Sequence, residues 1–304
     1  MRIGLTGGGA SVDRIVQQAV DAEADGFTSL WFASAVFGDP LVPMAIAGKA
    51  TNAIELGTSV LQTYTCHPVL QANRAVATAA AMERPGFTLG IGPSHHVVIE
   101  GAYGLSYAGV GAHTEEYVDV LAPLLRGEGV THSGTHFQVN IPVVNQPQQP
   151  VNLMVSALAP RLLRVAGEST AGTILWMANA RAIDAHVAPK INAAASAAER
   201  PAPRIVAGLP VAVHDDADEA REKAAKDFAN YGVLPNYRRI LDIGGAAGPA
   251  DAAIVGDETS VTAQIQALFD AGATDLWAAP FPVGDDRSAS RQRTRALLKE
   301  LAAA

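Results

Sequence analysis

The sequence predicts an α/β protein that folds as a single (β/α)8 barrel, or TIM barrel, with a small β-hairpin insertion. Apolar runs of strand length alternate with segments of helical periodicity along the chain. Several of these runs end in glycine and polar residues, as is typical where parallel strands deliver a site at their carboxyl ends. The length of 304 residues suits one barrel domain, residues 1–304. An open, twice-wound parallel sheet is the alternative.

The composition describes a folded enzyme-like protein rather than a nucleic-acid or membrane protein. Hydrophobic residues make up 49% and charged residues 17%, which is enough apolar surface for a large core. The net charge of -8 would repel nucleic acid and anionic membranes. No apolar signal core or membrane-length run is present, and the single cysteine, Cys66, fits a reducing compartment. We therefore expect a cytoplasmic protein.

The first half of the chain contains four strand-and-helix units. Strands are expected over residues 2–6, 28–33, 54–60 and 87–91. Helices are expected from residue 12, from residue 40 after a cap at Asp39, over 69–82 and over 113–125. The glycines at 7–9 do not complete the GxGxxG pattern and favour a tight turn.

The segment 127–150 interrupts this alternation. Two short alternating runs flank a Ser-Gly turn, which predicts the inserted β-hairpin. His132 and His136 lie four residues apart there, but without a third ligand nearby they favour a structural or surface role over a metal site.

The second half of the chain completes the predicted barrel. Strands are expected over residues 151–155, 172–177, 205–213 and 274–279, and helices from residue 160 and over 215–237, 257–271 and 288–301. The glycine- and alanine-rich stretch 242–256 specifies little regular structure, and we interpret it as a mobile lid over the barrel mouth.

Candidate functional residues follow the predicted strands. Gly92, Pro93 and Ser94 lead from a buried strand into His95 and His96, whose imidazoles titrate nearest neutral pH. Ser34 and Gln62 follow the second and third strands; the polar run 62–67 suits either a lined pocket or a solvated loop.

The turn at 156–160 leads into a helix that opens with Pro160. Free backbone amides there, with Arg161 close by, suit an anion, although an ordinary strand-to-helix turn explains the spacing equally well.

Three stretches carry a resemblance to a known family: GFTLGIGPSHHVVIEGAYGL, HTEEYVDVLAPLLRGEGVTHSGTHFQV and PVNLMVSALAPRLLRVAGES, which begin at residues 86, 113 and 150. Together they resemble the luciferase-like oxidoreductases, in particular the actinobacterial branch that uses the deazaflavin coenzyme F420. The resemblance implies a barrel that holds the cofactor ring at the carboxyl ends of its strands, and it implies a homodimer.

The resemblance also assigns cofactor contacts. Ser59 and Val60 match the position of a non-prolyl cis peptide behind the ring, and Gly92, Pro93 and Ser94 match the loop beside the ribityl chain. In the family, backbone amides bind the cofactor phosphate, and the matching residues here are Ser156, Ala157 and Leu158. A glycine-containing turn completes that phosphate site, and it is matched by Gly172 and Thr173. Two departures from the family are Ser34, where many relatives carry an acid, and the Thr-Ala-Gly at 170–172 in place of Ala-Asp-Gly.

We therefore expect an F420-dependent oxidoreductase that moves a hydride between C5 of the deazaflavin and a substrate carbon. His95, and after it His96, is expected to carry the proton. The glutamate tail of F420 would need basic residues, for which the candidates are Arg161, Arg164, Arg238 and Arg239. The alternatives are a monooxygenase that uses reduced FMN and a non-catalytic protein that binds such a cofactor.

Overall fold

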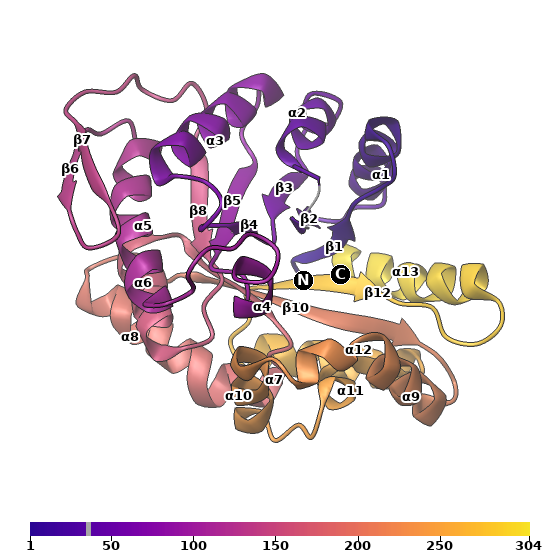
Figure 1. Ribbon diagram of the computed structural model, residues 1–304. Coiled ribbons are helices and arrows are strands. Elements are labelled where there is room, and N and C mark those ends of the chain that lie inside the picture. The colour runs from indigo at the N-terminus through magenta and orange to yellow at the C-terminus, as the bar shows by residue number, and fades with distance from the viewer. Residues whose placement is uncertain (35–37) are drawn as a thin grey trace.

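The computed structural model describes residues 1–34 and 38–304, and within them eight parallel strand positions close into a barrel (Figure 1). Its strands are β1 (Ile3–Gly7), β2 (Ser29–Phe32), β3 (Glu55–Thr58) continued by β4 (Leu61–Gln62), β5 (Phe87–Gly92), β8 (Val151–Val155), β9 (Gly172–Trp176), β10 (Arg204–Val213) and β12 (Asp275–Pro280). Neighbouring strands pair in chain order, and β12 pairs with β1 to close the ring. The predicted barrel is confirmed, and the open sheet is excluded.

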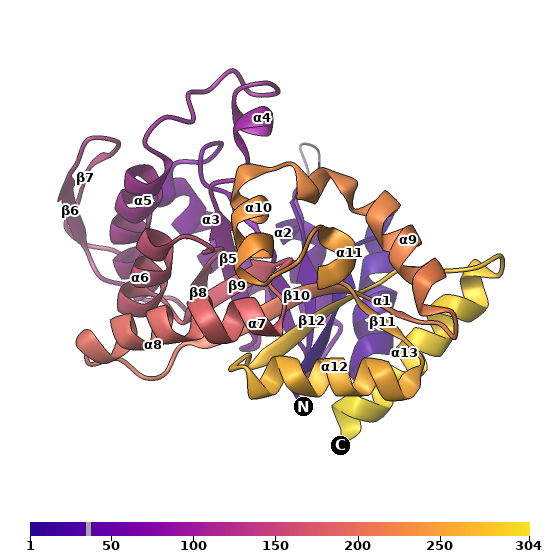
Figure 2. The same cartoon turned by 90° about the horizontal axis from the view of Figure 1, so that it is seen from below.

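Helices surround the barrel on its outer side (Figure 2). The longer ones are α1 (Val12–Ala24), α2 (Leu41–Lys49), α3 (Pro68–Met82), α5 (Val110–Leu125), α6 (Pro160–Ser169), α8 (Ala188–Ala197), α9 (Ala217–Asp227), α12 (Glu258–Asp270) and α13 (Arg287–Ala303). In the described part of the chain, no helix is both long and apolar enough to cross a membrane.

Local chemistry sets the helix starts next to the barrel mouth. His67 has extended backbone and its Nδ1 accepts a hydrogen bond from the Val69 amide at 3.3 Å, so the chain turns into α3 at Pro68. Asp39 accepts from the Leu41 amide at 3.0 Å in the same way ahead of α2. Both hydrogen bonds thus lie at the amino-terminal ends of helices that follow barrel strands.

A buried ion cluster closes the opposite, amino-terminal end of the barrel. Arg204, at the start of β10, donates to Glu55 at 2.9 Å and to Asp275 at 2.7 Å, and Arg2 pairs with the same two carboxylates. Burial alone would raise the pKa of Asp275, but Arg204 holds that pKa below its usual range. The cluster therefore ties β1, β3, β10 and β12 together, with the Asp275 carboxylate ionised.

The inserted hairpin forms as predicted, from β6 (Val130–Ser133) and β7 (Gln138–Ile141). Glu116 of α5 anchors its turn, because the carboxylate accepts hydrogen bonds from the amides of Thr135, His136 and Phe137 at 2.8 to 3.1 Å. Burial would raise the pKa of Glu116, yet these three amides lower it to about 2. The hairpin is thus fastened to α5 by a carboxylate that stays charged.

The structure departs from the sequence prediction between β9 and β12. The helix predicted over 215–237 is broken: α9 ends at Asp227, a 3-10 turn covers Ala229–Gly232, and α10 (Pro235–Ile243) starts at a proline. Helical structure also fills 180–197, where the sequence analysis assigned none, as α7 (Ala180–Ala182), a π-helical turn (Ile183–Val187) and α8.

The stretch interpreted as a lid is not a single loop. It contains the end of α10, the short helix α11 (Pro249–Ala252) and the strand β11 (Ile254–Gly256), which is buried and pairs with the outer half of β10. Its small residues pack closely rather than leaving the segment unstructured. Mobility of the part before α11 stays a prediction.

Candidate active site

Two connected cavities open at the carboxyl ends of the strands. The inner cavity, about 550 Å³, lies over the barrel axis, and the outer cavity, about 290 Å³, extends from it toward α6 and α10. They share Val60, Ser94, His95, Ser156 and Tyr237. The two cavities therefore adjoin each other, one above the barrel and the other beside α6.

Most residues proposed from the sequence line these cavities. The inner cavity contains Ser34, Ser59, Val60, Gln62, Ser94, His95 and Ser156, and the outer cavity adds Gly92, Pro93, Leu158 and Arg161. Four others do not line either cavity: His96, Ala157, Gly172 and Thr173.

The peptide bond between Ser59 and Val60 is cis, as the resemblance implied. It lies between β3 and β4, where the Ser59 amide donates to the carbonyl of Phe32 at 2.8 Å and so ties this point to β2. The Val60 side chain lines both cavities. This peptide therefore forms part of the wall between the strands and any bound ring.

Gly92 allows β5, β4 and β8 to approach one another at the cavity floor. A Cβ atom on Gly92 would lie 2.8 Å from Cγ2 of Val60 and 3.1 Å from Cβ of Ser156. Beyond it, the carbonyl of Ser94 accepts a hydrogen bond from the Tyr107 hydroxyl at 2.8 Å. Burial raises the pKa of Tyr107 to about 12, so the phenol keeps this proton and fixes the loop.

His95 is the one imidazole of the predicted pair that reaches the cavities. It is half-buried at the start of α4 (His96–Ile99), and its ring centroid lies 5.4 Å from that of Tyr237. Burial, with a smaller contribution from His96, lowers the pKa of His95, so its ring is neutral at neutral pH. His96 is exposed to solvent. The geometry therefore separates two histidines that the sequence could not rank.

In the turn after β8, the backbone amides without a partner in the protein lie slightly further along the chain than the sequence analysis expected. The Ser156 amide already donates to the carbonyl of Ile91 at 2.8 Å, and the Ala157 amide to Oγ1 of Thr173 at 3.2 Å. The first amide with an intrahelical partner is that of Leu163, which donates to Ala159. The amides of Arg161 and Leu162, whose residues line the outer cavity, are thus the donors that the first turn of α6 offers to an anion.

Gly172 and Thr173 lie at the amino end of β9, away from the mouth, which corrects their assignment to the phosphate turn. Gly172 pairs with Arg204 so closely that a Cβ would lie 2.0 Å from the Arg204 carbonyl oxygen. Thr173 is buried and donates to the Val155 carbonyl at 2.8 Å, so it supports the turn after β8 from below. The carboxyl end of β9 is instead Trp176, which lines the inner cavity.

Of the four arginines proposed for a cofactor tail, two line the outer cavity. Arg161 forms an ion pair with Glu115, and Arg239 is exposed at the cavity rim on α10. Arg164 binds Glu115 and Glu168 instead, and Arg238 binds Asp242 and the carbonyls of Ala246 and Ala247. Of these four arginines, Arg161 and Arg239 are therefore the ones that place positive charge beside the outer cavity.

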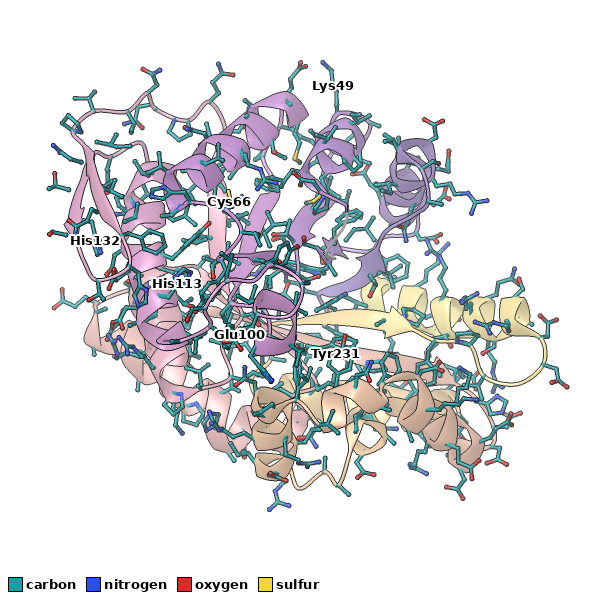
Figure 3. The ribbon with its side chains drawn as sticks, in the orientation of Figure 1. Lys49, Cys66, Glu100, His113, His132 and Tyr231 are labelled. Atoms are coloured by element: carbon teal, nitrogen blue, oxygen red, sulfur yellow. The ribbon has the colours of Figure 1, made fainter. Side chains whose placement is uncertain are left out.

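The sequence analysis missed an aromatic wall on the inner cavity, formed by Trp176, Trp277, Tyr231 and Tyr237. Ring centroids lie 5.1 Å apart for the two tryptophans, 5.7 Å for Trp176 and Tyr231, and 5.0 Å for the two tyrosines. Both tryptophans fall near the ends of predicted strands, which was an available signal. The tyrosines come from the segment predicted as one helix, and Tyr231 is labelled in Figure 3.

Three buried polar atoms of residues lining the inner cavity have no hydrogen-bond partner among the described residues: the acceptors Oγ of Ser59 and Oε1 of Gln62, and the donor Nε1 of Trp176. Buried polar atoms are normally paired, so all three are suited to a polar ligand. The hairpin histidines are not part of this site, and Figure 3 shows His132 well away from Tyr231. The described residues contain no group of three or more His, Cys, Asp or Glu arranged to hold a metal ion.

Comparisons with known proteins place this site in context. A coenzyme F420-dependent oxidoreductase, so assigned in Mycobacterium tuberculosis, is 29% identical over 161 residues, which is 48% of this chain and 46% of that protein. This match spans about half the length of each. The 5,10-methylenetetrahydromethanopterin reductase of Methanolobus tindarius is 24% identical over 306 residues, 90% of this chain and 92% of that enzyme.

Solved structures share the fold. An F420-dependent secondary alcohol dehydrogenase in complex with an F420-acetone adduct superimposes with a TM-score of 0.77 at 18% identity, over 97% of each chain. The oxygenating constituent of 3,6-diketocamphane monooxygenase of Pseudomonas putida, in complex with FMN, gives 0.72 at 19% identity, over 99% of this chain and 96% of that one. At these identities the likeness shows the fold alone.

A family model described as luciferase-like monooxygenase matches residues 2–302, nearly the whole chain. The barrel, the cis peptide after β3 and the cavities at the strand ends agree with the family resemblance seen in the sequence. The chain therefore belongs to the luciferase-like monooxygenase family.

Proposed function

We propose that this protein is an oxidoreductase dependent on coenzyme F420 that exchanges a hydride with a small organic substrate. The main observation behind the proposal is that the two adjoining cavities differ in charge. The inner cavity, at the barrel mouth, is lined by no Lys, Arg, Asp or Glu, whereas the outer cavity is lined by two arginines. A flat ring fits the first, and an anionic phosphate and glutamate tail fits the second. The relatives named as F420-dependent support the choice of cofactor.

The residues present fit this cofactor on structural grounds. The unpartnered Ser59 Oγ and Gln62 Oε1 would meet polar atoms at the edge of the ring, and Val60 would pack against its face. The first turn of α6 would bind the phosphate through the amides of Arg161 and Leu162. When bound, F420 supplies the hydride chemistry at C5 of its deazaflavin.

The protein contributes orientation, exclusion of water and a proton carrier. His95 is neutral, lines both cavities and can donate or accept a proton at an imidazole nitrogen as the substrate changes oxidation state. The aromatic wall limits the substrate to the space beside the ring and keeps water out of it. We therefore assign His95 as the catalytic residue, while His96 is left outside the site.

The experiment that tests the proposal is a pair of fluorescence titrations of the purified protein, one with F420 and one with FMN. Binding of F420 in preference to FMN supports hydride transfer, and turnover with alcohol or carbonyl substrates is then measured. Preference for FMN would replace the proposal with an FMN-dependent monooxygenase, which the FMN-bound structural neighbour makes the second candidate. Tight F420 binding without turnover of any substrate would indicate a binding protein.

A further inference from the structure

The inner cavity, which must also accommodate the substrate, has no permanently charged side chain in its lining. None of its lining residues, all of which are described in the structure, is Lys, Arg, Asp or Glu. Its titratable residues are His95, Tyr231 and Tyr237; burial lowers the pKa of the histidine and raises the pKa of both tyrosines. At neutral pH, therefore, the whole lining is uncharged.

The outer cavity provides the contrast. Its cations are Arg161 and Arg239, and both lie toward α6 and α10 rather than over the barrel axis. Anionic parts of a bound molecule would be drawn to that side. A carboxylate or phosphate placed in the inner cavity would lose its hydration without gaining an opposite charge, which is costly.

A nearby cation, Arg74, does not change this conclusion, because it lies outside the inner cavity. Arg74 lies in a side chamber that shares Ser34 and Gln62 with the inner cavity. One of its terminal nitrogens donates to Asp39, and the other donates to Oε1 of Gln71 at 3.0 Å and to Sγ of Cys66 at 3.5 Å. Arg74 does not line the inner cavity, and its guanidinium is directed at Asp39, Gln71 and Cys66.

The aromatic wall also sets the shape and polarity of what can bind beside the ring. Trp277 is fixed because its indole N–H donates to Oγ1 of Thr6 at 2.9 Å, and Thr6 in turn donates to the Ala278 carbonyl at 3.3 Å. With that N–H satisfied, Trp277 presents apolar ring surface to the cavity. Flat apolar groups pack well against such a surface.

We propose that the substrate is uncharged where it meets the cofactor and carries a flat, largely apolar body held against the aromatic wall. The proposal rests on the proposed function, because it takes the inner cavity to be the place where substrate and cofactor ring meet. Small neutral alcohols and ketones with an aryl group are the class that fits, whereas sugar phosphates and carboxylic acids are excluded.

The test uses F420-loaded protein and two matched probes, 1-phenylethanol and its para-carboxylate, 4-(1-hydroxyethyl)benzoate. Each is titrated while the absorbance of the bound cofactor is followed. We expect the neutral alcohol to bind at least about 10-fold more tightly, since only the carboxylate must be desolvated without a partner. Equal or tighter binding of the carboxylate, or no binding of the neutral alcohol up to its solubility limit, would overturn the proposal.

Substitutions separate charge from shape. Val98 lines the inner cavity from α4 and is half-buried, so Val98→Arg adds a cation there; it should raise the affinity for the carboxylate by about 10-fold, while Val98→Gln should not. Trp176→Phe should retain binding of the neutral alcohol, and Trp176→Ala should weaken it by about 10-fold. No difference within either pair would count against the proposal.

The cofactor titration is completed before any probe is added, so the two proposals fail separately. Absence of F420 binding contradicts the proposed function. Binding of F420 followed by a preference for the carboxylate contradicts only the inference about the substrate.

Discussion

Replacement of Arg204 by methionine should destabilise the protein by about 3–5 kcal/mol, because it leaves two buried carboxylates with too little positive charge. Arg204 makes contacts of 2.9 Å to each oxygen of Glu55, and of 2.7 and 3.2 Å to Asp275. The Asp275 side chain is 1% exposed and Glu55 10% exposed, so water cannot replace the lost donors. Arg2 remains, but it is half-exposed and reaches one oxygen of each.

The assay is urea unfolding of the purified protein at pH 7, followed by circular dichroism. Arg204→Lys is the matched control: it keeps the charge but cannot bridge both carboxylates, so its loss should be smaller. Because the pKa of Asp275 is lowered in the folded state, its contribution is present above its usual value of 3.8 and is lost as the pH falls further. The difference between wild type and Arg204→Met should therefore shrink below pH 3.8. A loss under about 1 kcal/mol at pH 7 would refute the argument.

Other predictions concern the site and the hairpin. His95→Ala should lower turnover about 100-fold with F420 affinity nearly unchanged, as steady-state kinetics and fluorescence titration would show; full activity would contradict the assignment. Since burial lowers the pKa of His95, the acidic limb of the pH–rate profile should lie below pH 6.5 and disappear in that variant. Arg239→Ala should weaken F420 binding about 10-fold, whereas Arg238→Ala, whose guanidinium binds local carbonyls, should have less effect on the same titration; equal effects would exclude a direct contact. Glu116→Gln should speed amide exchange at residues 135–137 by at least about 10-fold, and unchanged protection would show that the hairpin turn does not depend on this carboxylate.

The barrel could be predicted from the sequence because its signals are local. Apolar strands recur with helices between them, and turn residues such as Gly92 and Pro93 mark where strands end. Asp39 was predicted to cap a helix that starts at residue 40; α2 instead starts at Leu41 with Pro40 at the cap position, although Asp39 accepts a hydrogen bond from the Leu41 amide. The luciferase-like resemblance added the cis peptide at Ser59, which no pattern of apolar residues indicates.

The errors came from features that depend on the closed barrel. Gly172 was matched to the phosphate turn through the family resemblance alone, whereas the pairing of β9 with β10 shows that it lies at the amino end of its strand. Trp277 and Tyr237 are 40 residues apart in the numbering and meet in one cavity only when β12 and α10 converge. The break before Pro235 is different, because Gly232 and Pro235 both disfavour a helix interior and were a local signal that the prediction passed over. A cytoplasmic location and a homodimer stay predictions.

The ion pair between Arg161 and Glu115 has a consequence for how an anion enters the outer cavity. Two nitrogens of Arg161 lie 2.6 and 2.7 Å from the same carboxylate oxygen. An anion that binds to these two nitrogens displaces the carboxylate, so on this edge of the guanidinium one partner is exchanged for another. The net free energy that Arg161 contributes to binding is then the difference between its contact with the anion and its contact with Glu115. Because the two contacts are similar, this difference is small, and rapid release of the anion is favoured. Glu115 thus acts as a built-in competitor, and neutralising it should slow cofactor dissociation.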